Sequence, residues 1–200
     1  MNRQWEESQG REPGQSPLRK MPRERLDQIL EAHRKKMASE GREGEPAVLQ
    51  ETDLRGVNLS GADLRQVNFR GSDLQDADLR GADLQEANFW KVNLRGADLQ
   101  EANLKDAVLL RDTLQKANLR GANLQGAHLQ MADLRQADLE GANLAEAHLE
   151  GAILEEASLR GANLQGARLQ LANLTGATGL TREQLEPAIT DENTRLPAIQ

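Results

Sequence analysis

A large apolar residue returns at every fifth position of the chain, without a gap, from Leu49 to Leu174. These 26 positions hold leucine except for Phe69 and Phe89. Alanine stands two places earlier in 20 of the 26 units, and Asp or Asn stands directly before the large residue in 18. The other positions are mostly polar. A period of five this regular indicates one repeated structural unit rather than a succession of helices and strands.

Neither an α-helix nor a flat strand would bury all of these leucines. Five residues of helix advance about 140° beyond a full turn, which scatters them around the axis. In a strand, steps of five send successive leucines to opposite faces. A backbone that turns a corner once per unit buries them all, and four corners close a coil of about 20 residues, which stacks at roughly 4.8 Å. We therefore predict an all-β solenoid over residues 47–178, with about six and a half coils.

In such a coil, leucine and the small alanine before it point inward. Each buried leucine contributes roughly 1.5–3 kcal/mol, and hydrogen bonds between coils satisfy the buried peptide groups. The Asp or Asn and the two residues after leucine point outward. Glycines such as Gly56 and Gly81 fall at the corners, which need a positive φ.

The units Ala62-Asp63-Leu64-Arg65-Gln66 and Ala122-Asn123-Leu124-Gln125-Gly126 are typical of the repeat. Over residues 47–175 the chain resembles the pentapeptide-repeat family, with its A(D/N)LXX units. The resemblance implies a right-handed quadrilateral parallel β-helix. It also implies one possible function, since some members of that family bind gyrase as DNA mimics and confer quinolone resistance.

Both ends of the predicted solenoid need covering, because a stack of coils exposes apolar cross-sections. Residues 22–46 predict an amphipathic helix over 22–38 and a hinge at Gly41 and Gly44. One face of that helix carries Leu26, Ile29, Leu30, His33 and Met37. It is either a lid on the first coil or a helix for a dimer or partner. Residues 1–21 predict a disordered tail, and residues 179–200 a capping helix and tail that begins with a capping box at Thr181 and Gln184.

Composition and charge exclude several functions. The chain has no cysteine, so disulfides and thiolate metal sites are excluded. Its net charge is −7, of which residues 51–175 carry −6, and no basic face for nucleic acid is apparent. No apolar run is long enough to span a membrane, and the first residues lack the apolar stretch of a signal peptide. We expect a cytoplasmic protein without a cofactor.

Residues 20 apart should stack, so the sequence also predicts columns on the surface. The column that runs from Asp63 through Asp83 to Asn163 contains successive asparagines that should hydrogen-bond along the axis. A different side departs from the polar rule. Its off-pattern residues, which we predict to form a partner-binding or self-association face, are Trp90, Val108, Leu110, Met131, His128 and His148. The alternative is drift of the repeat, or cover from a terminal segment.

Two other departures bear on chemistry. His128 and His148 should stack, but only Glu150 stands near as a third ligand, so we expect no metal site. Asp112 takes an inward alanine position, where Arg111 could pair with it or Thr113 could cap it. Neither a nucleophile with a base nor a concave site is evident, so we expect no enzyme. Two hypotheses follow: a protein-interaction scaffold, and a DNA mimic that binds a type II topoisomerase, which the scattered arginines disfavour.

Overall fold

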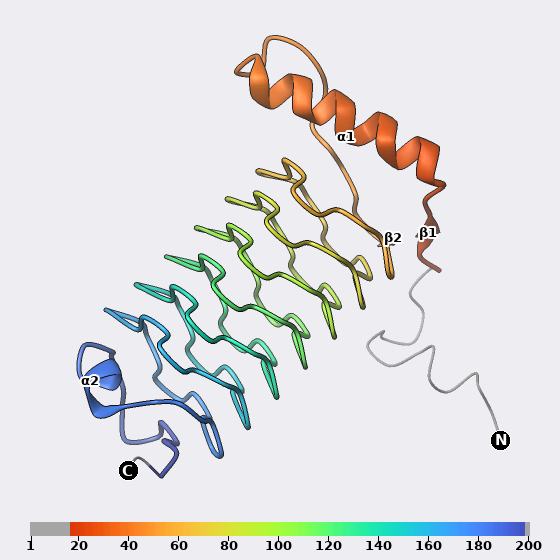
Figure 1. Ribbon diagram of the computed structural model, residues 1–200. Coiled ribbons are helices and arrows are strands. Elements are labelled where there is room, and N and C mark those ends of the chain that lie inside the picture. The colour runs from red at the N-terminus through yellow and green to blue at the C-terminus, as the bar shows by residue number, and fades with distance from the viewer. Residues whose placement is uncertain (1–16, 199–200) are drawn as a thin grey trace, which may run out of the picture.

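The molecule is a stack of four-cornered coils with a helix at each end (Figure 1). The structure is a computed structural model that describes residues 17–198. Its regular elements are β1 (Arg19–Lys20), α1 (Arg23–Ala38), β2 (Thr52–Asp53) and α2 (Arg182–Leu185). Between β2 and α2, parallel bridges join residues 20 positions apart, such as Asn58 to Asp78. The predicted solenoid is confirmed.

Each five-residue unit ends in a tight turn. The Val57 N–H donates to the Leu54 carbonyl at 3.2 Å, and Gly56 between them has a φ of 62°. A single positive φ at the third residue of a four-residue turn is the type II arrangement. Glycine occupies only 12 of these corners, while others carry side chains, as at Lys91 with a φ of 59°. The stacking of the coils therefore imposes the turn even where the residue does not favour it.

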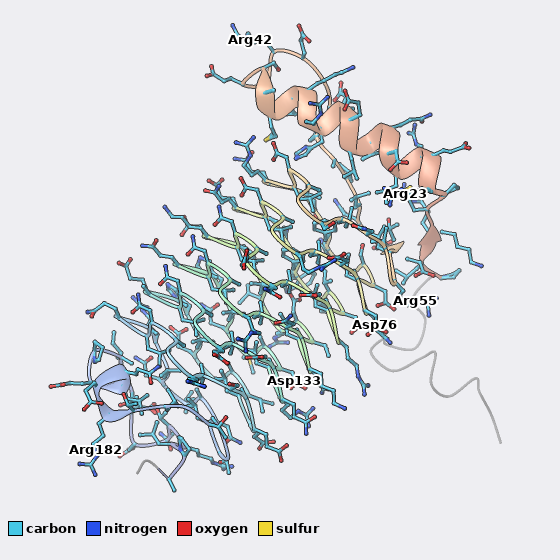
Figure 2. The ribbon with its side chains drawn as sticks, in the orientation of Figure 1. Arg23, Arg42, Arg55, Asp76, Asp133 and Arg182 are labelled. Carbon is cyan, nitrogen blue, oxygen red and sulfur yellow. The ribbon has the colours of Figure 1, made fainter. Side chains whose placement is uncertain are left out.

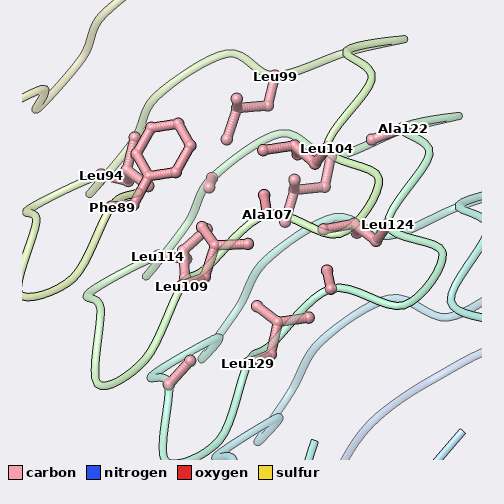
Figure 3. Close-up of a cluster of buried hydrophobic side chains, with 14 of the residues drawn as sticks. Phe89, Leu94, Leu99, Leu104, Ala107, Leu109, Leu114, Ala122, Leu124 and Leu129 are labelled. Carbon is pink, nitrogen blue, oxygen red and sulfur yellow. The ribbon is translucent and has the colours of Figure 1, made fainter. Parts of the chain in front are cut away.

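The inward side chains fill the rod completely. Leu104, Ala107 and Leu109 are each 0% exposed, and leucines of neighbouring coils lie above one another (Figure 3). Backbone groups are satisfied between coils, as where the Leu104 N–H donates to the Asn123 carbonyl at 2.7 Å. The interior is thus apolar side chains wrapped in a hydrogen-bonded backbone, as the repeat predicts.

The Asp or Asn before leucine closes each corner from outside. The Gln125 N–H donates to Asn123 Oδ1 at 3.3 Å, which is an Asx turn. From Asp83 to Asn163, each asparagine amide also donates to the residue 20 positions earlier, at 3.0–3.2 Å. The predicted asparagine ladder is confirmed. It begins at Asp83 rather than Asp63, because Asp83 is a carboxylate with no N–H to donate.

Helix α1 lies across the first coil (Figure 1). Leu26 and His33 are buried, and Ile29 and Leu30 pack partly against the core. The Ala47 N–H donates to His33 Nδ1 at 3.1 Å, so the imidazole is tied to the start of the coil. Burial lowers the pKa of His33, which favours the neutral ring that this hydrogen bond needs.

Residues 17–21 differ from the disordered tail predicted for 1–21. Arg19–Lys20 forms β1 and pairs in parallel with β2, and the Arg19 N–H donates to the Glu51 carbonyl at 2.8 Å. The first coil has backbone groups free on its outer edge, and an extended segment satisfies them without a hydrophobic pattern of its own. Residues 1–16 of that predicted tail lie outside the described residues.

At the other end, Thr181 and Gln184 form the predicted capping box at the start of α2. The Gln184 amide also donates to the Leu159 and Ala162 carbonyls, at 3.0 and 2.8 Å. Beyond α2, Ile189 bridges to Arg168, and Arg195 bridges to Asn173, so this segment extends the ladder. Across residues 17–198, no helix is both long and apolar enough to cross a bilayer.

Candidate interaction face

One side of the rod carries the off-pattern residues. We call it the Trp90 face: residues 87–91 and the units stacked on them in steps of 20, from 47–51 to 167–171. Parallel bridges join one column in the order Val48, Asn68, Asn88, Val108, His128, His148 and Arg168. Trp90 and Leu110 each come directly after the buried large residue of their unit, and they form the neighbouring column. Met131 lies one position further along its own unit. The six predicted residues therefore share one face.

Their exposure is lower than expected at the centre of the face. Trp90, Val108 and Leu110 are half-buried, as are both histidines, whereas Met131 is 58% exposed. Leu171, two coils beyond Met131 in its column, is 60% exposed and was not among the predicted contact residues. The apolar groups that reach solvent thus lie at both ends of the face, with Val48, 50% exposed, at the amino end, and the half-buried aromatic centre lies between them.

Two cations lie over the ring of Trp90. The Arg70 guanidinium carbon is 4.5 Å from the centroid of the indole ring, and Lys91 Nζ is 4.9 Å from it. Beneath this column, Phe69 and Phe89 are fully buried and stacked, with their ring centroids 5.1 Å apart. Cations over the face of an indole are held by its quadrupole. Trp90 is therefore half-buried with positive charge against its ring.

Where an aspartate stands directly before the leucine, the arginine after that leucine is neutralised within its own unit. Arg55 pairs with Asp53 at 2.8 Å, and Arg135 pairs with Asp133 at 2.6 Å; the labels Arg55 and Asp133 locate two of these units in Figure 2. Arg65 and Arg80 do the same, at 2.6 and 2.7 Å. The unit Asp-Leu-Arg is thus a self-contained ion pair, because the residues on either side of leucine both point outward.

The Trp90 face lacks this neutralisation. Asn68, Asn88 and Val108 stand where the aspartates would be. Within residues 17–198, Arg70, Lys91 and Arg111 have no carboxylate at ion-pair distance. Other cations such as Arg95 share this lack, but no aromatic ring accompanies them among the described contacts. An acidic rod therefore carries a local cluster of positive charge around its exposed tryptophan edge. The missing aspartates are the sequence signal that could have revealed this cluster.

The two histidines stack as predicted, with ring centroids 4.8 Å apart. His148 Nδ1 lies 3.7 Å from Glu150 Oε1, and the Arg168 guanidinium lies at the same distance from that oxygen. Burial lowers the pKa of His148, and the nearby Glu150 opposes that shift. Among the described residues, no three His, Cys, Asp or Glu side chains gather as metal ligands would.

The column below Leu110 has a feature that the sequence did not reveal. Gln130, Glu150 and Gln170 each keep one buried side-chain oxygen without a hydrogen-bond partner. The residues two places earlier are His128, His148 and Arg168, which cannot make the Asx turn found at other corners. This half of the face is thus less completely hydrogen-bonded than the regular sides of the rod.

Asp112 is buried, 1% exposed, inside the rod. The predicted relief by Arg111 or Thr113 is wrong, because Asp112 Oδ1 instead accepts the Val92 N–H of the preceding coil at 2.9 Å. Its other oxygen has no partner, and burial raises the pKa of the carboxyl well above its usual value. With apolar side chains packed around it, this acid has no room for a substrate.

Comparisons with known proteins identify the repeat. The family model for pentapeptide repeats matches eight copies, over residues 47–85, 72–109, 113–141 and 142–178. No curated protein matches the chain. Among solved structures, the chain is similar to full-length QnrB1, a plasmid-mediated fluoroquinolone resistance protein, with 18% identity and a TM-score of 0.50 over 72% of this chain and 84% of that one. It is also similar to HetL, a protein involved in heterocyst differentiation regulation from Nostoc sp. strain PCC 7120. The identity to HetL is 30%, over 82% of this chain and 91% of that one, with a TM-score of 0.26.

Proposed function

The chain belongs to the pentapeptide-repeat family, and on that premise we propose that it is a non-catalytic scaffold that binds a partner protein through the Trp90 face. The observation that carries this proposal is that Arg70 and Lys91 both lie over the ring of half-buried Trp90, with no carboxylate to neutralise either cation within residues 17–198. Tryptophan and arginine are the residues that most often dominate binding energy at interfaces. Met131 extends the same face with an exposed apolar side chain.

The charge of this face indicates the kind of partner. Residues 51–175 carry a net charge of −6. An acidic partner surface is therefore attracted to the cationic cluster and repelled by the rest of the rod. A partner with acidic groups around an apolar centre would fit both the cations and Trp90. The same features make a second copy of this chain another possible partner. It would bind either through this face or through the end segments.

A scaffold role also follows from what fills the rod. The leucine and alanine side chains of the repeat leave Asp112 as a single enclosed acid without a base or nucleophile beside it. Catalysis needs a site that admits substrate and at least one pair of cooperating groups. We accordingly propose no catalytic residue, cofactor or metal, and a cytoplasmic location, which a chain without cysteine suits.

The end segments support this role as caps. Helix α1 buries Leu26 and His33 against the first coil, and Gln184 fastens α2 to the last part of the solenoid. Capped ends keep a solenoid soluble and free its sides for binding. That the β-helix is right-handed and that it has about six and a half coils remain predictions from the repeat and the family.

The test is a photocrosslinking amino acid placed at Met131 in the full chain, in cell lysate. We expect a discrete protein adduct that is lost in Trp90→Asp and in Arg70→Glu. Arg120→Glu is the matched control, because that arginine is already paired with Glu140 at 2.6 Å on another side of the rod. Circular dichroism of each variant checks the fold. The same adduct from the wild type and from Trp90→Asp contradicts the proposal, and light scattering of both proteins shows whether the adduct is a homodimer.

The second candidate is a DNA mimic that binds a type II topoisomerase. Its support is the family and the stacked aspartates, such as Asp78 and Asp98. Against it, Arg80 lies 2.7 Å from Asp78 and 3.7 Å from Asp98, so the column is largely neutralised. A gyrase supercoiling assay with excess protein decides: unchanged supercoiling removes this candidate and leaves the scaffold proposal untouched.

A further inference from the structure

The amino-terminal end of the rod contains an open groove of about 520 Å³ between β1, α1 and the chain that enters the first coil. Its apolar surface comes from side chains that include Met21, Ile29 and Val48. Val48 is 50% exposed at its floor, which is unusual for a valine in the bridged part of this rod. We call this feature the α1 groove.

The floor of the α1 groove is an unfinished ladder. Val48 bridges to Asn68 on its inner side. On its outer side, within residues 17–198, the Val48 carbonyl accepts only a weak hydrogen bond from the Arg19 guanidinium, at 3.5 Å. On the adjoining side of the same coil, β1 supplies the missing strand and pairs with β2. At this end of the rod, the extended segment β1 thus pairs with the first coil beside Val48. Among the described residues, no strand pairs with the outer backbone edge of Val48 itself.

The walls of the groove are cationic. Arg19, Lys20 and Arg25 line it, and Glu45 is the one acid among its lining residues. None of these three cations has a carboxylate at ion-pair distance in the described part of the chain, whereas Arg23 and Arg34 on α1 are paired with Asp27 and Glu31. Asp53 lies opposite Lys20 across the β1–β2 pair and offsets part of its charge. The groove therefore combines an apolar floor, a free strand edge and three cations without an ion pair.

We propose that the α1 groove binds an extended acidic segment of a partner protein, which adds as a strand over Val48. Main-chain hydrogen bonds to the free edge would give affinity, as in other cases of strand addition. Alternate side chains of the segment would point to Val48 and Ile29, and the acidic ones between them would meet Lys20 and Arg25. The charge of the walls selects an acidic segment over a basic one.

The α1 groove adjoins the amino-terminal edge of the Trp90 face, because Val48 begins that column. Its walls come from α1 and β1, and Trp90 does not line it. Trp90→Asp should consequently leave binding at the α1 groove unchanged. The two proposals can therefore fail independently.

The experiment measures fluorescence anisotropy of a labelled eight-residue peptide of alternating glutamate and valine, added to the full chain. We expect binding that weakens with added salt, and no binding of the matching lysine–valine peptide. Lys20→Glu combined with Arg25→Glu should weaken binding at least about tenfold. Arg34→Glu combined with Lys35→Glu makes the same change in net charge on the paired side of α1 and should change binding less than about twofold.

A further variant tests the strand edge itself. Val48→Pro removes the backbone N–H that an added strand would use, and should abolish binding while circular dichroism stays unchanged. Equal binding of the glutamate and lysine peptides, or equal losses in the two charge variants, would overturn the proposal. So would competition by oligothymidylate as strong as by the peptide, because it would mark a general polyanion surface.

The chain's own amino-terminal residues are the alternative occupant, since they lead into β1. A full-length variant with Glu6, Glu7 and Glu12 all changed to lysine separates the two cases. If the acidic peptide binds this variant much more tightly than it binds the wild type, the groove belongs to the chain's own segment and the partner proposal is wrong. Unchanged affinity supports an external partner.

Discussion

At the scale of single residues, the rod tolerates an inward polar group where a backbone partner lies within reach. Ser72 accepts the Thr52 N–H at 3.0 Å and donates to the Leu49 carbonyl, so both functions of its hydroxyl are used. Asp112 occupies the same inward column two coils later but has a partner for only one oxygen. The same position therefore suits a hydroxyl and is costly for an ionised carboxylate.

Asp112 should make the stability of the rod depend on pH. The folded state raises the pKa of this carboxyl through burial, so it binds a proton that the unfolded chain releases above about pH 3.9. The free energy of unfolding should thus fall as pH rises through the window between the unfolded and folded pKa, by up to about 1.4 kcal/mol per pH unit. Asp112→Asn keeps the acceptor for the Val92 N–H and removes the ionisation.

Urea unfolding of the wild type and of Asp112→Asn between pH 4 and pH 8 measures this effect. The difference between the two curves should grow with pH, with the asparagine variant the more stable. Asp106→Asn, at an exposed corner of the rod, is the matched control and should not reproduce the trend. Parallel curves for the wild type and Asp112→Asn would show that Asp112 stays ionised in the folded protein.

At the scale of the element, the corner is the unit that the sequence must satisfy. Gly96 and Gly141 have nearly the same φ, 67° and 69°. Their surroundings differ, because the Asp76 carboxylate lies where a Cβ on Gly96 would stand, whereas a Cβ on Gly141 meets nothing within 4 Å. Glycine is needed at the first corner for space as well as for its backbone angle, and at the second for the angle alone.

Substitution by alanine should separate these two contributions. Gly141→Ala should cost about 1 kcal/mol for the left-handed backbone. Gly96→Ala should cost this and roughly 0.5–1 kcal/mol more, because the exposed Asp76 side chain must leave its present rotamer. The excess should vanish in the double variant Asp76→Ala with Gly96→Ala, which chemical denaturation measures as a coupling free energy. Equal costs at both glycines would mean that the Asp76 side chain moves aside freely.

The sequence could predict features that depend on the spacing of side chains, but not features that depend on backbone groups. The inward leucines, the asparagine ladder and the capping box at Thr181 follow from spacing and were recoverable, because each depends on residues a fixed step apart. The strand at Arg19–Lys20 was missed, since it forms on backbone groups of the first coil and has no side-chain pattern. The partner of Asp112 was missed for the same reason. The Val92 N–H is a backbone group 20 residues away, and no side chain indicates its position.

The interaction face was only partly predictable. The column of Trp90 follows from the step of 20, but its half-burial with Arg70 and Lys91 over its ring depends on rotamers. The arginines were interpreted as interruptions of an acidic surface, whereas Arg55, Arg65 and Arg80 pair within their own units. The absence of such pairs around Trp90 becomes visible only once the pairs elsewhere are known.

At the scale of the whole molecule, the rod should open from its ends, because each coil contacts only its neighbours. The carboxyl end is held to the last coil from one side only, by groups that include the Gln184 amide, which donates to the Leu159 and Ala162 carbonyls, and the bridges at Ile189 and Arg195. Central coils instead have neighbours on both sides. Protection against hydrogen exchange should therefore be highest near the middle of the rod and decline towards both ends.

Gln184→Ala tests this arrangement, because it removes both amide hydrogen bonds and one half of the capping box while leaving every leucine in place. Amide exchange measured by mass spectrometry should rise about tenfold or more between residues 155 and 195. Peptides around Leu104 should stay unchanged, since the coils there do not depend on the end. Gln125→Ala is the control, because this glutamine stands at a central corner and its side chain makes no hydrogen bond to another coil among the described residues. A uniform rise along the whole rod would instead mean that the solenoid unfolds as one cooperative body, and that its ends do not control its opening.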